Sequence, residues 1–234
     1  MIPTPDLSHL TSADYESVYE PAEDTYLLLD ALEQDADRLK GLNGAVCLEV
    51  GSGSGCVSSF LGSVLGSKAL YLCTDINPHA CICTFKTGSQ NKVCYYHYST
   101  DRQPFTLQVS LDPVNTAFAG PFHRRLKNAI DVILFNPPYV PTDLEEALNA
   151  QSKSRIEGSW AGGHDGMDVT DRFLDVVNEL LSPRGRFYLV ALKQNDIPNI
   201  QRRMQDKFGL ISEAVLQRRA GSEHLFILRF QRAS

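Results

Sequence analysis

The sequence contains no long hydrophobic run. No segment approaches the roughly 18 consecutive apolar residues that a membrane-spanning helix needs. Residues 1–19 contain Asp6, Asp14 and Glu16 but neither Lys nor Arg, so the positively charged start of a signal peptide is missing. We therefore expect a soluble protein of the cytoplasm, with the nucleus as a second compartment.

Closely paired cysteines are also missing. The sequence has six cysteines, but no two of them form a Cys-x-x-Cys pair, and several lie inside apolar, strand-like runs. Such cysteines are usually buried and reduced, and they lack the spacing of a zinc site. We expect no disulfide framework and no metal site. The six are Cys47, Cys56, Cys73, Cys81, Cys83 and Cys94.

Basic residues are in the minority. The sequence has 22 Lys and Arg residues against 28 Asp and Glu residues, and its formal net charge is -6. This balance disfavours a protein that holds nucleic acid by neutralising phosphates. Two arginine pairs, Arg202-Arg203 and Arg218-Arg219, come nearest to a basic patch, and such pairs are usually solvated surface.

Short apolar runs alternate with helix-like stretches between residues 45 and 134. This pattern is typical of a parallel sheet covered by helices, whose strands are apolar because both faces are buried. Seven such runs, the last two forming an antiparallel hairpin, predict an α/β fold. The expected strands are residues 45–50, 69–74, 93–98, 130–135, 186–192, 210–217 and 223–229.

Helices are expected between these strands and ahead of them, at residues 23–39, 56–65, 77–88, 168–181 and 197–208. A turn is expected at residues 182–185, and residues 102–129 are expected to be irregular or partly helical. A chain of 234 residues has the length of one domain. We expect an N-terminal extension over residues 1–18 and a single domain over residues 19–234.

A glycine-rich run, Gly51-x-Gly53-x-Gly55, follows the first expected strand. It lies where a strand turns into a helix, at the carboxyl edge of the sheet where open α/β folds bind ligands. Glycines there let the backbone approach a ligand closely. Cys56 stands beyond the last glycine, and the third glycine of the GxGxxG pattern is missing, which disfavours a dinucleotide.

Acidic residues end the strands around this loop. Asp75 ends the second expected strand, close to the position of the acid that binds ribose hydroxyls in nucleotide-binding folds. Glu49 precedes the end of the first strand and suits a ligand that carries an ammonium group. S-adenosylmethionine has such a group, whereas dinucleotides do not, so these residues favour S-adenosylmethionine as the cofactor.

Two further residues complete the expected cofactor site. Asp101 ends the region of the third expected strand, where it can accept a hydrogen bond from the adenine amine, and Ile76 can pack on the adenine ring. The alternative is that these acids only cap the helices that follow their strands. The combination of a glycine loop with three acids favours the cofactor.

The motif Asn136-Pro137-Pro138-Tyr139 directly follows the fourth expected strand. A planar amide nitrogen is a poor nucleophile, so a site that methylates it must hold it in line with the donor and accept its hydrogens. The Asn136 side-chain oxygen and the Pro137 carbonyl can be the two acceptors, and the prolines stiffen the loop. Tyr139 offers an aromatic face for the flat group. A proline-rich turn without a function is the alternative.

The sequence resembles the HemK-like protein-glutamine methyltransferases that modify translation release factors, in their eukaryotic and archaeal branch. The matching runs are Val18-Tyr19-Glu20-Pro21-Ala22-Glu23-Asp24-Thr25, the loop from Glu49 to Gly55, Thr74-Asp75-Ile76-Asn77-Pro78, Phe135-Asn136-Pro137-Pro138-Tyr139-Val140, and Trp160-Ala161-Gly162-Gly163 with Asp165-Gly166. Asn-Pro-Pro-Tyr alone is shared with adenine-N6 methyltransferases. The first and last of these runs are much more restrictive.

The resemblance implies a seven-stranded class I methyltransferase fold with a Rossmann-like sheet. It implies that the substrate is the glutamine of the Gly-Gly-Gln motif in a class 1 release factor, held by Asn136 and the Pro137 carbonyl. It also implies a heterodimer with a small zinc-binding activator protein, for which residues 69–73 are our candidate sheet edge. The cofactor contacts that it implies are Thr25, Glu49, Gly51, Asp75, Asp101 and Asn136.

Three functions stay open at the level of sequence. The first is methylation of a release-factor glutamine. The second is the same chemistry on another target, either a protein lysine such as one in a histone or adenine N6 in nucleic acid. The third is a binding subunit that keeps the pocket without turnover, against which the intact motif at Asn136 counts.

Overall fold

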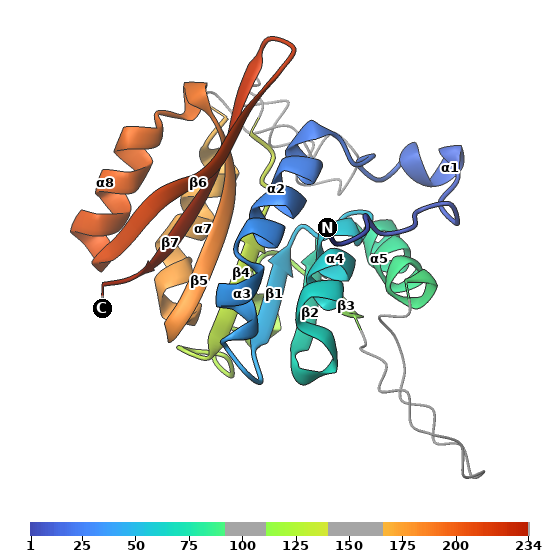
Figure 1. The fold of residues 1–234 in the computed structure, drawn as a ribbon, viewed down its shortest axis with the longest axis horizontal. Helices are drawn as coiled ribbons and strands as arrows, with labels where there is room; N and C mark the ends of the chain where they lie inside the picture. Colours follow the sequence, from blue (N-terminus) through green and yellow to red (C-terminus); the bar gives the residue numbers. More distant parts are fainter. Residues whose placement is uncertain (92–110, 140–165, 234) are drawn as a thin grey trace.

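The computed structural model describes residues 1–91, 111–139 and 166–233, whose centre is one seven-stranded sheet (Figure 1). The strand order is β3-β2-β1-β4-β5-β7-β6, with β7 antiparallel to both of its neighbours and the other pairs parallel. This confirms the predicted α/β fold and its C-terminal hairpin. The strands are β1 (Val46–Val50), β2 (Leu70–Asp75), β3 (Leu111–Asn115), β4 (Ile130–Phe135), β5 (Leu181–Leu192), β6 (Leu210–Ala220) and β7 (Glu223–Arg232).

Helices cover both faces of the sheet (Figure 1). One face packs against α2 (Glu23–Gln34), α3 (Ala36–Lys40) and α4 (Cys56–Leu65), with α5 (Pro78–Gln90) beside α4. The opposite face packs against α7 (Asp168–Leu180) and α8 (Ile197–Phe208). The chain also contains the short helix α1 (Ser12–Tyr15) and the 3-10 turns η1 (Gly66–Lys68), η2 (Gly120–Phe122) and η4 (Lys193–Asn195).

The central strands are apolar because neighbouring residues enter opposite cores. In β1, Cys47 packs in the core under α4 and Leu48 packs in the core under α7. All six residues of β4 are buried, as expected for a strand that has helices on both sides. Glu49 therefore points to the same face as Cys47, toward α4, and this placement matters for the site.

The helix expected over residues 23–39 is divided into α2 and α3. The break falls at Asp35, which is buried and has a backbone outside the helical region. Its carboxylate accepts a hydrogen bond of 2.7 Å from the Tyr188 hydroxyl and forms an ion pair with Arg229. The tertiary contacts of one buried side chain interrupt a continuous helical pattern, and sequence periodicity contains no sign of them.

The strand that borders β2 in the described sheet falls in a region that was not predicted to contain one. The expected strand at residues 93–98 lies outside the described residues. The strand that pairs with β2 is β3, which falls in the region expected to be irregular, residues 102–129. Its sequence Leu-Asp-Pro-Val-Asn contains a proline, which is rare inside sheets but tolerated on an outer strand.

The position of β3 also corrects the expected sheet edge. Residues 69–73 fall largely in β2, which pairs with β1 on one side and with β3 on the other. Among the described strands, β3 and β6 are the two outer ones. The prediction that residues 69–73 form an exposed edge is therefore wrong, and β3 is the outer strand on that side of the described sheet.

The turn expected at residues 182–185 lies inside β5, at an irregular point of its pairing with β4. Gly185 passes close to the neighbouring strand, since a Cβ at this position would stand 2.8 Å from the Ile130 carbonyl oxygen. The glycine marks a close approach between strands and not the end of one. The other predicted helices and strands lie within a few residues of their expected bounds.

The N-terminal residues lie against α5. The Asp6 backbone N–H donates to Asn91 Oδ1 over 2.7 Å, and Asn77 Nδ2 donates to the Ser17 carbonyl over 2.7 Å. These two hydrogen bonds attach the N-terminal segment to both ends of α5. In the described part of the chain, we find no helix with the length and apolarity to cross a membrane.

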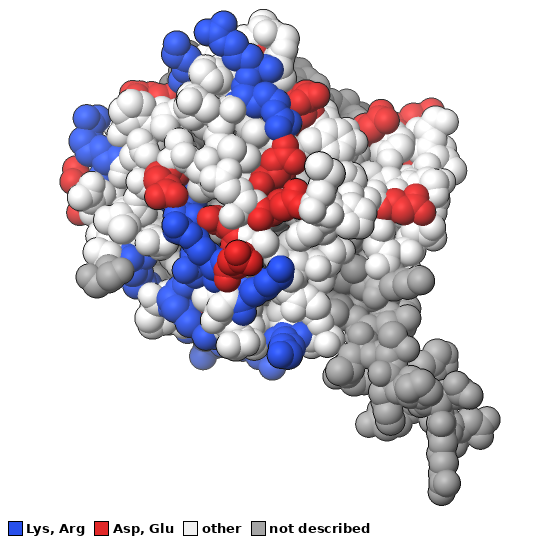
Figure 2. Space-filling model, in the orientation of Figure 1, with Lys and Arg blue, Asp and Glu red and all other residues white. Residues whose placement is uncertain are grey.

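Charged side chains pair across the surface. Arg218, on the β6–β7 hairpin, donates to Asp30 of α2 over 2.5 Å, and Arg203 of α8 donates to Asp171 of α7 over 2.9 Å. Figure 2 shows acidic side chains along α2 beside the basic end of the hairpin. Arginines from both pairs singled out in the sequence are thus bound to carboxylates of the chain.

Candidate active site

The glycine loop turns β1 into α4 with a backbone that other residues rarely adopt. Gly51, Gly53 and Gly55 have φ angles of 72°, 52° and 78°. A Cβ at Gly55 would stand 2.7 Å from Thr84 Cα, so α5 packs directly on the loop. Gly51 has open space where a Cβ would be, and that space belongs to a pocket.

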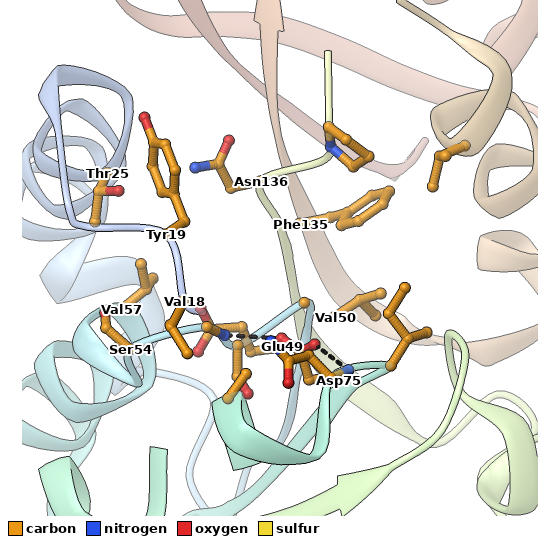
Figure 3. A pocket seen from close by; sticks show the side chains of 18 of the residues that line it. Val18, Tyr19, Thr25, Glu49, Val50, Ser54, Val57, Asp75, Phe135 and Asn136 are labelled. Atoms are coloured by element: carbon orange, nitrogen blue, oxygen red, sulfur yellow. Dashed lines mark hydrogen bonds between the residues drawn. The ribbon is translucent and has the colours of Figure 1, made fainter. Parts of the chain in front are cut away.

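This pocket has a volume of about 590 Å³, in the range of small-molecule sites, and lies at the carboxyl ends of β1, β2 and β4. Figure 3 shows Tyr19 and Asn136 on one side of the pocket and Glu49 and Asp75 on the other. The predicted site residues that line it are Thr25, Glu49, Gly51, Gly53, Asp75, Ile76, Asn136, Pro138 and Tyr139. Gly55 and Pro137 do not line it, and Asp101 lies outside the described residues.

Asp75 faces the glycine loop. Its Oδ2 accepts the Gly53 N–H over 3.0 Å and its Oδ1 accepts the Asn77 N–H over 2.8 Å, while burial raises the pKa of the carboxyl. The cap of α5 is a different residue, because the Asn77 side chain accepts the His79 N–H over 2.9 Å. The alternative that Asp75 only caps a helix therefore fails, and each carboxylate oxygen keeps a lone pair for a ligand hydroxyl.

Glu49 is a buried carboxyl at the base of the pocket. Both the backbone N–H of Ser58, at 3.0 Å, and the Ser58 hydroxyl donate to its Oε2. Glu49 thus satisfies one of the free N–H groups in the first turn of α4, as the capping alternative predicted. Burial nevertheless raises its pKa to about 8, and no cation within the described residues offsets that effect.

Asn136 carries the most informative contact of the site. Its Nδ2 donates to Asp24 Oδ2 over 2.8 Å, and its Oδ1 is buried without a hydrogen-bond partner in the described part of the chain. The carboxylate accepts only, so it fixes the amide with the nitrogen toward Asp24 and the oxygen away from it. A buried acceptor without a partner is rare and costs about 1–3 kcal/mol, so it points to a ligand that donates.

Asp24 also collects two tyrosine hydroxyls. The Tyr139 hydroxyl donates to Oδ2 over 2.8 Å and the Tyr19 hydroxyl donates to Oδ1 over 3.2 Å. Burial and the negative charge of Asp24 both raise the pKa values of the two phenols, which therefore stay protonated. The tyrosine of the motif is thus fixed at its hydroxyl while its ring lines the pocket.

Asp24 and Tyr19 were not among the predicted site residues. Both belong to the run from Val18 to Thr25, which served only as a mark of the family, apart from Thr25. A signal was available: an aspartate at the second position of an apolar helix becomes a buried charge when the helix packs on the sheet, and buried charges need partners. Two of the partners, Asn136 and Tyr139, are more than a hundred positions away, which no local pattern reveals.

The far wall of the pocket comes from the segment after β3. Thr116, Ala117 and Phe118 line it, in the place that the sequence analysis gave to the acid at the end of the third strand. Phe118 has a φ of 49°, an unusual backbone for a phenylalanine, and its ring contacts Phe135 and lies under the Arg172 guanidinium, 5.7 Å from the ring centroid. An aromatic surface therefore bounds this end.

The sheet order, the reversed β7 and a pocket above the glycine loop define a class I methyltransferase. A scan against models of protein families gives no match. The chain is 45% identical to Methyltransferase HEMK2 of Mus musculus over 99% of its length and 98% of the relative. It is 41% identical to the eRF1 methyltransferase catalytic subunit mtq2 of Schizosaccharomyces pombe, over 99% of this chain and 96% of that relative. The chain belongs to the HEMK2/mtq2 family of methyltransferases.

Solved structures share the fold. The structure of the E. cuniculi Mtq2-Trm112 complex superimposes with a TM-score of 0.61 and 24% identity, covering 92% of this chain and 99% of that one. The T. Thermophilus 16S rRNA N2 G1207 methyltransferase in complex with AdoMet and guanosine also superimposes with a TM-score of 0.61. Its sequence identity is 17%, and the match covers 92% of this chain and 44% of that one. These similarities confirm the predicted fold class.

Proposed function

We propose that this protein transfers a methyl group from S-adenosylmethionine to the side-chain amide nitrogen of a glutamine in the release factor eRF1. The S. pombe relative is named for eRF1 methylation, and it is similar over nearly the whole length of both chains. The E. cuniculi Mtq2-Trm112 complex is responsible for methylation of the same factor. The glutamine is the one in the Gly-Gly-Gln motif that the family resemblance implies.

The observation that carries this proposal is the unpaired Asn136 Oδ1 in the pocket, which has no partner among the described residues. A glutamine amide presents two N–H donors in a plane, and its lone pair is delocalised, so the site must supply fixed acceptors. Asn136 is such an acceptor, because Asp24 prevents its amide from turning over. The Pro137 carbonyl remains our candidate for the second acceptor.

The residues opposite Asn136 fit the cofactor. Asp75 can accept the ribose hydroxyls, and the buried Glu49 carboxyl, with its raised pKa, can receive the ammonium group. Ile76 and the wall at Phe118 provide apolar surface for the adenine ring. When bound, the cofactor supplies an electrophilic methyl group on a positively charged sulfur. The protein's part is to align the amide, keep water away and hold one of its N–H groups on Asn136 Oδ1.

We further propose that the protein works with a small zinc-binding partner of the Trm112 type, since the similar E. cuniculi Mtq2 chain forms a complex with Trm112. Because β2 is an inner strand of the sheet, we place this contact on another strand. Among the described strands, β3 is the outermost on the side of α5, so it can extend the sheet onto another chain.

The test is a transfer assay with labelled S-adenosylmethionine. The chain, co-expressed with its partner, is incubated separately with eRF1, with histone and with duplex DNA, and the labelled residue is identified by mass spectrometry. We expect label on a glutamine of eRF1. Asn136→Ala should reduce the transfer rate by at least about a hundredfold, as the loss of a fixed polar group in other active sites does.

The alternatives have their own outcomes in this assay. Label on a histone lysine, with none on eRF1, would assign the lysine reaction, and label on DNA alone would assign adenine N6. Either result would contradict the proposed substrate while leaving the cofactor site intact. No label on any substrate, with cofactor binding preserved, would favour a binding subunit.

A further inference from the structure

A second group of reactive side chains lies outside the pocket. Asp14 of α1 and two residues of α5, His79 and Cys83, place one carboxylate oxygen, one imidazole nitrogen and one sulfur within 4.8 Å of one another. His79 and Cys83 are four positions apart on one face of α5. The proposed reaction uses none of the three, and 65 residues separate Asp14 from His79, so no motif in the sequence indicates the group.

Two of the three distances are close to the spacing of ligands around a tetrahedral zinc ion. With Zn–N and Zn–O near 2.1 Å and Zn–S near 2.3 Å, the N···O and S···O separations are about 3.4 and about 3.6 Å. The structure has 3.0 Å between His79 Nε2 and Asp14 Oδ1 and 3.8 Å between Cys83 Sγ and the same oxygen. Shifts of a few tenths of an ångström would bring both pairs to the zinc spacing.

The surroundings support each ligand. Asp14 Oδ2 accepts the backbone N–H and the hydroxyl of Thr11, each over 2.8 Å, which orients Oδ1 toward the other two groups. Cys83 is fully buried in a small apolar cluster with Leu10 and Val18. The His79 side chain is 38% exposed, so an ion can enter and solvent can complete its coordination.

One cation already competes for this place. Lys86 Nζ lies 3.9 Å from Asp14 Oδ1, one turn beyond Cys83 on α5. Its side chain is 48% exposed and can turn into solvent, where its ammonium is well hydrated. Lys86 therefore balances the charge of Asp14 without a metal, and it can turn away when an ion binds.

We propose that Asp14, His79 and Cys83 bind a divalent, thiolate-accepting ion of the Zn²⁺ class. The ion ties the N-terminal segment to α5 at a point that bears on the cofactor pocket. The Ser17 carbonyl accepts Asn77 Nδ2 over 2.7 Å, and Val18 lines the pocket. Metal binding thus stabilises one wall of the pocket from outside and takes no part in the methyl transfer.

The test uses cobalt(II) as a spectroscopic probe and the tag-free full-length chain. A thiolate ligand gives an intense sulfur-to-cobalt charge-transfer band, which added zinc abolishes by displacement. We expect this band in the wild type and in the control Cys81→Ser, whose thiol is on the same helix but outside the group. Cys83→Ser should lose it, and His79→Gln should weaken cobalt binding by at least about tenfold.

A second measurement remains informative if a variant folds poorly, and it takes into account the zinc that the partner protein itself contains. The co-expressed complex is analysed for metal by mass spectrometry, and the wild type should hold about one zinc more per complex than His79→Gln, a change at a partly exposed side chain. Equal zinc contents, or a cobalt band that survives Cys83→Ser, would overturn the proposal. Neither readout depends on methyl transfer, so failure here leaves the proposed function untouched.

Discussion

The carboxylate of Asp24 illustrates how much of the site depends on single residues. It is 3% exposed, and it accepts from the Asn136 amide, from the hydroxyls of Tyr19 and Tyr139, and from the Thr25 backbone N–H over 2.7 Å. One charge thereby fixes two aromatic walls and the orientation of the amide. Asn136 supplies the acceptor, and Asp24, 112 positions earlier in the sequence, fixes its orientation.

The change Asp24→Asn should lower kcat by about tenfold to a hundredfold. The Asn136 amide and the Tyr139 hydroxyl donate to one oxygen of Asp24, and the Tyr19 hydroxyl and the Thr25 N–H donate to the other. An asparagine has an NH2 group in place of one of these oxygens, so it cannot accept from all four donors, and the Asn136 amide is held less firmly. Steady-state kinetics with eRF1 measures the effect. Asp30→Asn is the matched control, since Asp30 lies on the same helix and pairs with Arg218 at the surface. A loss as large in Asp30→Asn would mean that α2 matters only for stability.

Glu49 should make cofactor binding depend on pH. Its pKa is about 8 without a ligand, and an ammonium group binds the ionised form, so below pH 8 the carboxyl must lose a proton on binding. Affinity for S-adenosylhomocysteine should therefore rise by up to about tenfold between pH 6 and pH 7, and less steeply toward pH 8. Calorimetry measures this, with Glu49→Gln as the reference. A wild-type affinity that stays constant over this range would remove Glu49 from the ammonium site.

At the scale of elements, the glycine loop joins β1 to α4 and supports α5. Gly55 combines a positive φ with a contact that no side-chain movement relieves, because the nearest atom to an added Cβ is Thr84 Cα at 2.7 Å. The loop is therefore part of the packing between α4 and α5 as well as a lining of the pocket. This double role explains why Gly55 faces away from the pocket although it belongs to the same run as Gly51.

Gly55→Ala should destabilise the fold by more than about 2 kcal/mol, the sum of the strain at positive φ and the backbone clash. Gly209→Ala has nearly the same φ, 66°, but nothing within 4 Å of the added Cβ, so it should cost only about 1 kcal/mol. Urea unfolding of both variants separates the two contributions. Equal losses would show that the contact with Thr84 relaxes easily.

How far the sequence predicts these elements depends on whether the signal is local. The helix at residues 56–65 and the cap at Asn77 follow from neighbouring residues and were predicted correctly. The strand β3 was not predicted because its sequence contains a proline and an aspartate, which are uncommon in strands. The break at Asp35 was missed because its cause, Arg229, is almost 200 positions away. In the candidate site the backbone loop and the motif were found, whereas the residues that hold them in place were not.

On the scale of the whole molecule, one buried network joins the helices to the C-terminal hairpin. Arg229 of β7 is 2% exposed; it pairs with Asp35 between α2 and α3 and donates to Glu213 of β6 over 2.6 Å. Tyr188 of β5 donates to the same Asp35. The helix that carries Asp24, α2, is therefore tied to the hairpin at one end and, through Asn136, to the end of β4 at the other.

Removing the cation of this network should be costly. Arg229→Met should lower the free energy of unfolding by about 3–5 kcal/mol, because Asp35 is left buried with only the exposed Arg38, 3.7 Å away, as a counter-charge. The double change Asp35→Leu with Arg229→Met should recover much of that loss, as the uncompensated charge disappears. Arg219→Met, at an exposed position of the same hairpin, should stay within about 0.5 kcal/mol of the wild type in urea unfolding. An Arg229→Met variant as stable as the wild type would contradict the role of this pair.

The central claim is that Asn136 Oδ1, which has no partner in the part of the chain that the structure describes, faces a flat NH2 group beside the cofactor. A crystal structure of the protein with its partner, S-adenosylhomocysteine and a peptide containing Gly-Gly-Gln tests it most directly. We predict that the glutamine nitrogen lies within hydrogen-bond distance of Asn136 Oδ1, with Asn136 Nδ2 still on Asp24. An adenosyl group bound away from Glu49 and Asp75, or an Asn136 oxygen turned onto a protein donor, would contradict the account.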